Sequence, residues 1–234
     1  MNKIKVFLDG ADRSQILETA KNPQVHGFTT NPSLMRKSGV KDYRQFCQEI
    51  LTQIEGKPIS FEVFADEFPE MKRQAEEITT WGPNVYVKIP VINSKGESAA
   101  PLIRELASRK VKLNVTAVFT LSQSWAVCQA LKGGAPSILS VFAGRIADTG
   151  RDPMPILCGA AEMCRETDKN IELLWASTRE AYNFVQAEQS GCRIITAPLD
   201  MVKKAAGFGK DLLDMSLDTV RTFKSDAESA GFSL

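Results

Sequence analysis

A lysine lies inside a segment that otherwise has the composition of a buried strand. Lys88 is the only charged residue of Val85–Pro90, which is rich in β-branched and aromatic residues and ends in proline. A buried ammonium group is costly unless it is paired or has lost its proton. A deprotonated lysine attacks carbonyl carbon and forms a Schiff base. Lys88 is therefore a candidate nucleophile, and the alternative is a lysine near a strand end that extends to water.

Other apolar segments carry or end in polar residues that could take part in the same chemistry. These residues are Asp9, Thr30, Asn31, Glu62, Asn114, Thr116 and Ser140. Asp9 could instead begin a helix, Asn31 could form a turn, and Glu62 could be a plain ion-pair partner of Lys88. Together, two carboxylates, amides, hydroxyls and a lysine fit carbonyl chemistry, with the lysine as nucleophile and the carboxylates moving protons.

A second group of residues could bind a phosphate. Arg145, Ser177 and Arg179 follow the predicted sixth and seventh strands. Barrels commonly bind phosphate near their last strands, and two guanidinium groups with a hydroxyl suit a phosphate dianion. The alternative is a pair of surface arginines. Ser177 also stands where a helix N-cap is expected, so it could serve both purposes.

Short apolar segments alternate with amphipathic segments along the chain. The predicted strands are Ile4–Asp9, Gly27–Asn31, Ile59–Ala65, Val85–Pro90, Lys112–Thr120, Ser137–Ala143, Ile171–Ala176 and Arg193–Pro198. The predicted helices include Asp12–Asn22, Asp42–Glu55, Glu67–Trp81, Ala99–Ser108, Leu121–Leu131, Pro153–Thr167 and Thr178–Glu188. Eight such units predict an α/β fold, a single-domain (β/α)8 TIM barrel over residues 1–234. A doubly wound sheet is the alternative. In a barrel, the polar residues above meet at the C-terminal ends of the strands.

Residues 212–230 form a predicted helical extension after the eighth strand and its helix. Leu213, Leu217, Val220 and Phe223 recur there at helical spacing. Such a stripe must cover the chain's own barrel or a neighbouring subunit, since in water it would be an exposed apolar patch.

Composition excludes several classes of function. The 29 basic and 28 acidic residues give a net charge of +1, which provides no general electrostatic footprint for nucleic acid or an anionic membrane. The five cysteines show no close CxxC spacing, and His26 is the only histidine, so a disulfide framework or a histidine-based metal site is not expected. No apolar run is long enough for a signal sequence or a membrane span. We therefore expect a cytoplasmic protein.

The polar segments, taken in order, resemble the transaldolase family. The matching segments are Phe7-Leu8-Asp9, Thr29-Thr30-Asn31-Pro32-Ser33, Phe61-Glu62-Val63, Val87-Lys88-Ile89-Pro90, Asn114-Val115-Thr116, Phe142-Ala143-Gly144-Arg145 and Ala176-Ser177-Thr178-Arg179. The resemblance covers nearly the whole chain, and its length is similar to that of the short subfamily, which also contains fructose-6-phosphate aldolases.

The resemblance implies a class I aldolase-type mechanism without metal or cofactor. Lys88 would form the Schiff base, and Asp9 would move the proton of the donor hydroxyl. Glu62 with Thr116 would position a catalytic water. The resemblance also implies substrate-binding residues: two asparagines for substrate hydroxyls and three residues for the phosphate, namely Asn31, Asn114, Arg145, Ser177 and Arg179. Thr30, Ser140 and Phe142 complete the predicted substrate site.

Two positions bear on the reaction that the resemblance implies. The short aldolases usually have glutamine at the position of Glu62 and tyrosine at that of Phe142, so both residues favour transaldolase. A fructose-6-phosphate aldolase is the nearest alternative, and a catalytically silent barrel that binds sugar phosphates is an alternative of another class. The resemblance further implies a homo-oligomer, a pentamer or decamer, in which the C-terminal helix passes to a neighbouring subunit.

Overall fold

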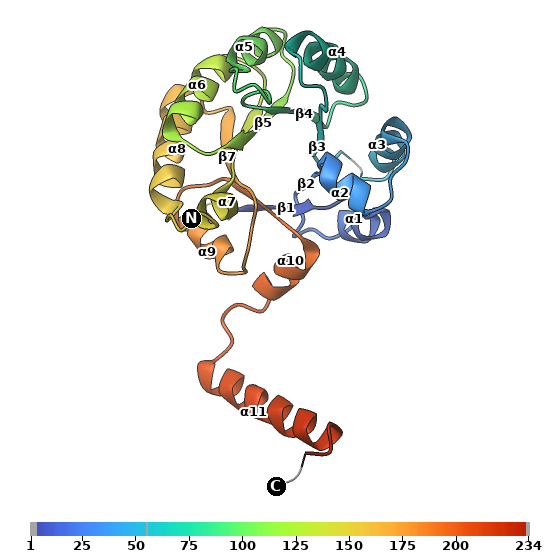
Figure 1. The fold of residues 1–234 in the computed structure, drawn as a ribbon, viewed down its shortest axis with the longest axis vertical. Helices are drawn as coiled ribbons and strands as arrows, with labels where there is room; N and C mark the ends of the chain where they lie inside the picture. The colour runs from blue at the N-terminus through green and yellow to red at the C-terminus, as the bar shows by residue number, and fades with distance from the viewer. Residues whose placement is uncertain (1–3, 55, 233–234) are drawn as a thin grey trace.

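The computed structural model describes residues 4–54 and 56–232 of the 234-residue chain. Eight parallel strands close into a barrel in sequence order, and β1 pairs with both β2 and β8 (Figure 1). The strands are β1 (Lys5–Asp9), β2 (Gly27–Thr29), β3 (Ile59–Glu62), β4 (Val85–Pro90), β5 (Leu113–Val118), β6 (Ser137–Val141), β7 (Ile171–Trp175) and β8 (Ile194–Ala197). The predicted (β/α)8 barrel is confirmed, and closure of the sheet rules out the doubly wound alternative.

Helices surround the barrel and connect its strands (Figure 1). They are α1 (Arg13–Ala20), α2 (Pro32–Lys37), α3 (Tyr43–Leu51), α4 (Phe68–Thr79), α5 (Ala100–Ser108), α6 (Leu121–Leu131), α7 (Ala143–Ala147), α8 (Met154–Thr167), α9 (Asn183–Gln189) and α10 (Leu199–Ala205). A final helix, α11 (Leu212–Ser229), follows them. Among the residues that the structure describes, no helix is both long and apolar enough to cross a membrane.

The alternation of side chains along each strand separates two layers. Residues such as Phe61, Val87 and Val115 point outward and pack with the helices in one large apolar core. A second, small apolar cluster consists of inward-facing residues together with Tyr86 and Phe142, namely Phe7, Ile138, Leu174, Ala176 and Ile194. Most of these residues stand two positions before a polar residue of the site on the same strand face, so they form an apolar floor beneath it.

Side-chain caps begin several helices where strands end. The side chain of Asn31 accepts a hydrogen bond from the backbone N–H of Leu34, and Pro32 occupies the first turn of α2. Thr120 caps α6 in a capping box.

Two sequence-based boundaries, the end of β6 and the start of the helix after β7, are wrong. The helix predicted over Thr178–Glu188 begins at Asn183, so Ser177 is not its N-cap. Ser177 has a φ of 65° and lies in a loop. The strand predicted over Ser137–Ala143 ends at Val141, because Ala143 already begins α7.

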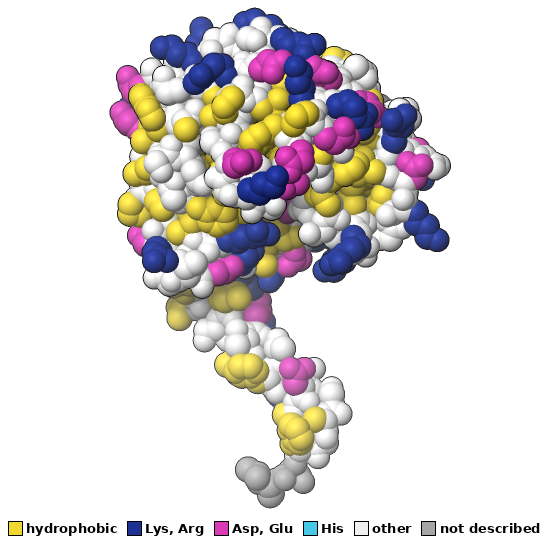
Figure 2. Space-filling model, turned by 45° about the horizontal axis from the view of Figure 1, so that its top comes forward, with side chains coloured by type: hydrophobic (Ala, Val, Ile, Leu, Met, Phe, Trp, Pro, Cys, Tyr) yellow, Lys and Arg dark blue, Asp and Glu magenta, His cyan; other side chains and the backbone are white. Residues whose placement is uncertain are grey.

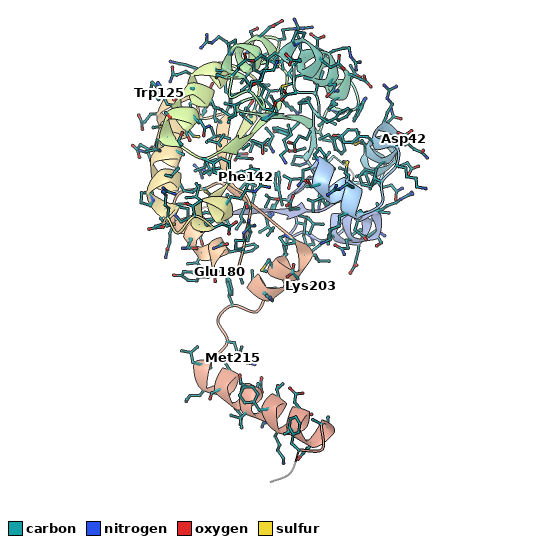
Figure 3. All side chains as sticks on the ribbon, viewed as in Figure 1. Asp42, Trp125, Phe142, Glu180, Lys203 and Met215 are labelled. Atoms are coloured by element: carbon teal, nitrogen blue, oxygen red, sulfur yellow. The ribbon has the colours of Figure 1, made fainter. Side chains whose placement is uncertain are left out.

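The C-terminal extension lies apart from the barrel (Figures 1 and 2). α11 begins at the predicted Leu212 and ends at Ser229, one residue before the predicted bound. Its apolar side chains are exposed, with 81% of Leu213 and 66% of Phe223 accessible. Met215, labelled in Figure 3, is also exposed on this helix. The stripe predicted from the sequence therefore has no cover from its own barrel.

Candidate active site

The nitrogen of Lys88 lies at the centre of the polar layer. Lys88 is 6% exposed, and its Nζ is 3.0 Å from Oε2 of Glu62 on the neighbouring strand β3. The same nitrogen donates to the backbone carbonyl of Thr30 over 3.1 Å. Glu62 and Lys88 are direct register partners, which places both side chains inside the barrel. The buried lysine is thus paired, in agreement with the cost of burying a lone charge.

Asp9, at the end of β1, lies close enough to Lys88 for the charge of the lysine to affect its carboxyl group. Burial raises the pKa of its carboxyl group, while the nearby charge of Lys88 and a hydrogen bond from Thr29 lower it. The Thr29 hydroxyl donates to Oδ1 of Asp9 over 2.8 Å. A carboxylate whose pKa is raised by burial and that stands near a lysine is suited to accept and return a proton.

Asn114 is held in one orientation by two hydroxyl groups. Its Nδ2 donates to Oγ of Ser60 over 2.9 Å, and Oγ of Ser140 donates to its Oδ1 over 2.7 Å. All three residues are almost completely buried. The network aligns β3, β5 and β6 and fixes which atoms of the amide face the interior.

Thr116 has a different environment on the same strand. Its buried hydroxyl has no hydrogen-bond partner among the residues that the structure describes. Thr116 pairs in register with Pro90, two residues beyond Lys88, and so stands nearer the mouth of the barrel. A buried hydroxyl of this kind is available to a water molecule or a substrate group.

The predicted phosphate residues lie at the same end of the barrel, after β6 and β7. The guanidinium carbon of Arg145 lies 5.0 Å from the ring centroid of Phe142, a cation–π contact. Arg179 forms a two-point ion pair with Asp148, with distances of 3.1 and 2.7 Å. The hydrogen bond from Arg179 lowers the pKa of the Asp148 carboxyl. Both side chains are therefore available near the surface, one of them engaged by a carboxylate that a phosphate could replace.

A close backbone contact fixes the loop that carries these residues. A Cβ atom on Gly144 would lie only 1.7 Å from the carbonyl oxygen of Ser177 and 2.9 Å from Cγ of Arg179. Only glycine allows α7 to approach the loop after β7 this closely. The positive φ of Ser177 lies in the same segment. The close contact thus brings together the segments after β6 and β7 that carry the predicted phosphate residues.

Two of the predicted site residues, Asn31 and Thr30, form hydrogen bonds with the protein backbone. Oδ1 of Asn31 is occupied by the cap of α2, which leaves its amide nitrogen as the group that can reach a substrate. The hydroxyl of Thr30 donates to the backbone carbonyl of Ser60, so this residue joins β2 to β3.

Sequence reasoning missed Ser60, Thr29 and Thr196 as parts of the site. Thr29 and Ser60 share hydrogen bonds with predicted site residues, and Thr196 on β8 shares one with Thr29. Serine and threonine are ordinary in strands, and only the closure of the barrel shows their partners. In the described part of the chain, no group of three or more histidine, cysteine or acidic residues could hold a metal ion.

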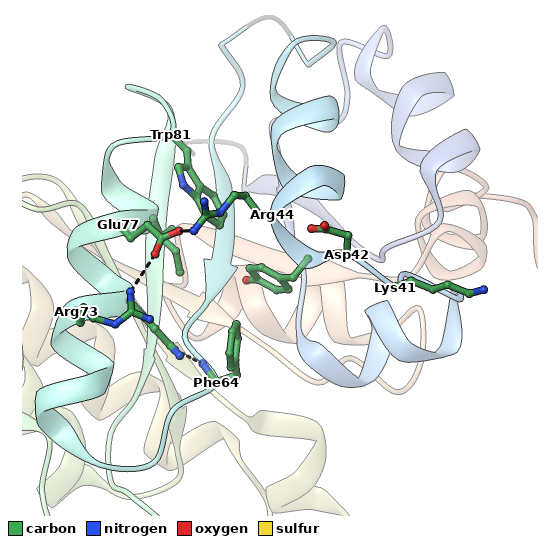
Figure 4. A pocket seen from close by; sticks show the side chains of 10 residues that line it. Lys41, Asp42, Arg44, Phe64, Arg73, Glu77 and Trp81 are labelled. Atoms are coloured by element: carbon green, nitrogen blue, oxygen red, sulfur yellow. Dashed lines mark hydrogen bonds and ion pairs between the residues drawn. The ribbon is translucent and has the colours of Figure 1, made fainter.

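A groove of about 320 Å³ lies outside the barrel, between α3 and α4 (Figure 4). Tyr43, Phe64 and Trp81 form its aromatic walls, and Arg73 bridges to Glu77 over 3.2 Å. The groove is separate from the polar layer, although the hydroxyl of Tyr43 donates to the backbone carbonyl of Glu62 over 2.7 Å. Through this hydrogen bond, Tyr43 contacts the strand end that carries Glu62.

Comparisons with known proteins identify the family of the chain. The family model described as "Transaldolase/Fructose-6-phosphate aldolase" matches residues 6–234. A probable transaldolase of Dehalococcoides mccartyi is 35% identical over 83% of this chain and 87% of its own length. A probable transaldolase of Mesorhizobium japonicum is 37% identical over 83% of this chain and 85% of its own length.

A similar fold is found among solved structures. A putative dihydrodipicolinate synthase family protein from Coccidioides immitis aligns with a TM-score of 0.58 at 8% identity, over 83% of this chain and 67% of that one. At this identity the likeness concerns the fold alone.

Proposed function

Because the chain belongs to the transaldolase and fructose-6-phosphate aldolase family, we propose that it is a transaldolase. The proposed reaction converts sedoheptulose 7-phosphate and glyceraldehyde 3-phosphate into erythrose 4-phosphate and fructose 6-phosphate, a step of the pentose phosphate pathway. The observation that carries the proposal is the buried Lys88, whose Nζ lies 3.0 Å from Glu62 in the barrel that also holds Asp9.

The reaction begins with covalent attachment of the donor. Lys88 transfers a proton to Glu62, and the neutral amine attacks the ketone carbon. The proton then passes to the departing hydroxyl, so that loss of water gives an iminium ion. Glu62 is within hydrogen-bond distance of the reacting nitrogen. Together with the unpartnered hydroxyl of Thr116, it holds the water molecule that relays protons in this step.

Carbon–carbon cleavage follows on the bound donor. Asp9 accepts the proton of the donor hydroxyl while the bond breaks, and the electron pair flows into the iminium group. The first aldehyde leaves, and the three-carbon unit remains on Lys88 as a neutral enamine. This carbon then attacks the acceptor aldehyde, and Asp9 returns its proton to the new hydroxyl. Water finally hydrolyses the resulting iminium ion, which releases the product ketose and restores the amine of Lys88. The iminium ion is the electron sink throughout, so the proposal needs no metal or cofactor.

The remaining predicted residues bind and orient the substrate. The amide of Asn114, fixed by Ser60 and Ser140, and the free amide nitrogen of Asn31 bind substrate hydroxyls. Arg145, Ser177 and Arg179 bind the phosphate at the outer end of the site, where Arg179 exchanges Asp148 for the phosphate oxygens.

Two residues support transfer over simple cleavage, as the family resemblance implies. Glu62 carries a carboxylate where the short aldolases usually have an amide. Phe142, which lies against Arg145, has no hydroxyl group that could protonate and release the three-carbon unit. Fructose-6-phosphate aldolase is the alternative within the same family.

Trapping the covalent intermediate tests the proposed mechanism. Borohydride added with fructose 6-phosphate should attach a reduced three-carbon adduct to the peptide that contains Lys88, as measured by mass spectrometry. Lys88→Arg should abolish labelling and turnover, because a guanidinium group stays protonated and cannot form the imine. Lys112→Arg is the matched control. Lys112 lies just before β5, at the opposite end of the barrel, and its Nζ donates to the backbone carbonyl of Pro83. A label on another lysine would contradict the assignment.

A second measurement separates the two activities of the family. Erythrose 4-phosphate should strongly accelerate the consumption of fructose 6-phosphate. If free dihydroxyacetone forms equally fast without any acceptor, the protein is an aldolase instead.

We also propose a cytoplasmic location and a ring-type homo-oligomer, a pentamer or decamer. The five free cysteines are consistent with a reducing compartment. The exposed stripe of α11 supports assembly, because a second subunit would cover it.

A further inference from the structure

Three oxygen atoms from three strands form a hydrogen-bonded chain that ends on Asp9. Oγ1 of Thr196 on β8 lies 2.5 Å from Oγ1 of Thr29 on β2. Oγ1 of Thr29 lies 2.8 Å from Oδ1 of Asp9 on β1. Thr29 and Thr196 are 2% and 5% exposed, so both hydroxyls lie in the protein interior.

Counting hydrogen atoms gives the chain a direction. A threonine hydroxyl carries one hydrogen atom, and when Asp9 is ionised its oxygen can only accept. The hydroxyl of Thr29 therefore donates its single hydrogen atom to Asp9. The bond between the two threonines must then be donated by Thr196 and accepted by Thr29. The donors run from β8 through β2 to the carboxylate on β1.

The first member of the chain is itself held in place. The hydroxyl of Thr178 donates to the backbone carbonyl of Thr196 over 2.7 Å. Thr196 pairs in register with Phe7, two residues before Asp9 on the same strand. The hydroxyl of Thr196 thus has a fixed position relative to β1. The proposed mechanism assigns no role to this hydroxyl.

We propose that Thr196 is a positioning residue that acts through Thr29 to orient the Asp9 carboxylate and to favour its ionised form. This inference rests on the proposed function, in which Asp9 accepts a proton as an anion. Thr196 touches neither the substrate nor the reacting atoms. It orders the hydroxyl of Thr29 so that its hydrogen atom points at Asp9 and nowhere else.

The surroundings of Asp9 contain few charges that compete with this effect. Among the residues that the structure describes, Lys88 on β4 and its partner Glu62 on β3 are charged groups that face the same interior, while β2 and β8 contribute the two hydroxyls. Burial raises the pKa of Asp9, whereas Lys88 and the Thr29 bond lower it. Weakening the chain should therefore raise the pKa further, because a hydrogen bond to the charged form favours that form.

Carbon-13 NMR of protein labelled at the aspartate carboxyl carbon tests the inference, with Asp9→Asn used to assign the signal. Thr29→Val removes the bond to the carboxylate and should raise the pKa of Asp9 by about one to two units. Thr196→Val removes only the cooperative part, roughly 10–30% of that, and should raise the pKa by about 0.1–0.6 units. Thr196→Ser keeps the hydroxyl and should leave the pKa unchanged. Thr52→Val, at an exposed helix end, is the matched control.

The double variant decides whether Thr196 acts through Thr29. In the Thr29→Val background, Thr196→Val should cause no further shift, because its route to Asp9 is already cut. An equal shift in both backgrounds, or none in the single variant, would overturn the inference. If Thr196→Val does not fold, Thr196→Ala against Thr196→Ser gives the same comparison.

The titration is independent of turnover, so it separates this inference from the proposed function. If Asp9→Asn retained full activity, the proposed function would fail while the NMR shifts could still support the chain. If Asp9→Asn is inactive and the shifts are absent, only the role of Thr196 fails. Where both hold, the acid limb of kcat should move to higher pH in Thr196→Val and return in Thr196→Ser, with KM little changed.

Discussion

The ion pair between Lys88 and Glu62 makes a strong prediction about stability. The two charges are 3.0 Å apart, and their side chains are 8% and 18% exposed. At an effective dielectric constant of about 20, this separation corresponds to roughly 5 kcal/mol of attraction, offset by the cost of desolvating both groups. Removing one partner leaves the other charge buried without its ion-pair partner, so Lys88→Met and Glu62→Gln should each reduce the free energy of unfolding by about 3–5 kcal/mol.

The double variant should recover most of that loss. In Lys88→Met/Glu62→Gln neither charge of the pair remains buried, and replacing a buried pair by neutral groups is often nearly neutral. The coupling energy from the cycle should therefore be about 3 kcal/mol or more. Urea unfolding at pH 7 and one fixed protein concentration measures each free energy. The assay follows unfolding, so it does not depend on catalysis.

A second ion pair of this chain is the matched control. Lys5 and Glu172 are 2.9 Å apart at the other end of the barrel, with side chains 48% and 31% exposed. Solvent screens this pair, so its cycle should give a coupling of less than about 1 kcal/mol. If the coupling of Lys88 with Glu62 is as small as that of the control, the reasoning about the buried charges is wrong.

Four further predictions concern single residues and the tail. Burial raises the pKa of Asp9 in the folded protein, so the stability that this group contributes is fully present below its unfolded pKa and is lost as pH rises through its folded pKa. Asp9→Asn should therefore raise Tm at pH 7 while abolishing turnover, and an unchanged or lower Tm would contradict this. Arg179→Gln should lower kcat/KM for phosphorylated substrate by about 10–150-fold with a much smaller effect on unphosphorylated fructose, whereas equal losses would show a structural role. Phe142→Tyr should increase the release of dihydroxyacetone relative to transfer, measured with and without acceptor aldehyde. Deleting the residues after Leu212 should give smaller and less stable species in light scattering, and an intact protein that is only a 25.8 kDa monomer would refute assembly.

The sequence predicted the strands well because apolar runs interrupted by turns are a direct signal of buried strands. Their ends were less certain, since polar residues at the barrel mouth look the same in a strand and in a loop. Asn31 was assigned to a strand, yet its side chain leaves β2 to cap α2. The helix after β7 was placed too early because Ser177 resembles a cap. In the structure, the side chain of Asn183 accepts from the backbone N–H of Arg179 and shapes a loop instead.

The candidate site was predictable only in part. Lysine and carboxylates in apolar segments are conspicuous because burying a charge is costly. Thr196 and Ser60 carry no such signal, since hydroxyl residues are common in strands. Their importance depends on partners that lie 167 and 54 positions away in the chain. Such pairs become visible once the barrel is closed.

The alternation of side chains along the strands also makes this scaffold suitable for redesign. The outward residues bind the barrel to its helices, while the inward residues near the mouth belong to a separate polar layer. Because neighbouring positions on one strand face opposite sides, a library that varies Ser60, Asn114 and Ser140 would leave the large outer core intact. New substrate preferences could then be selected with little loss of folded protein, provided that substitutions within this hydrogen-bonded trio are made jointly. The strand pleat thus separates the part of the barrel that can evolve from the part that must stay constant.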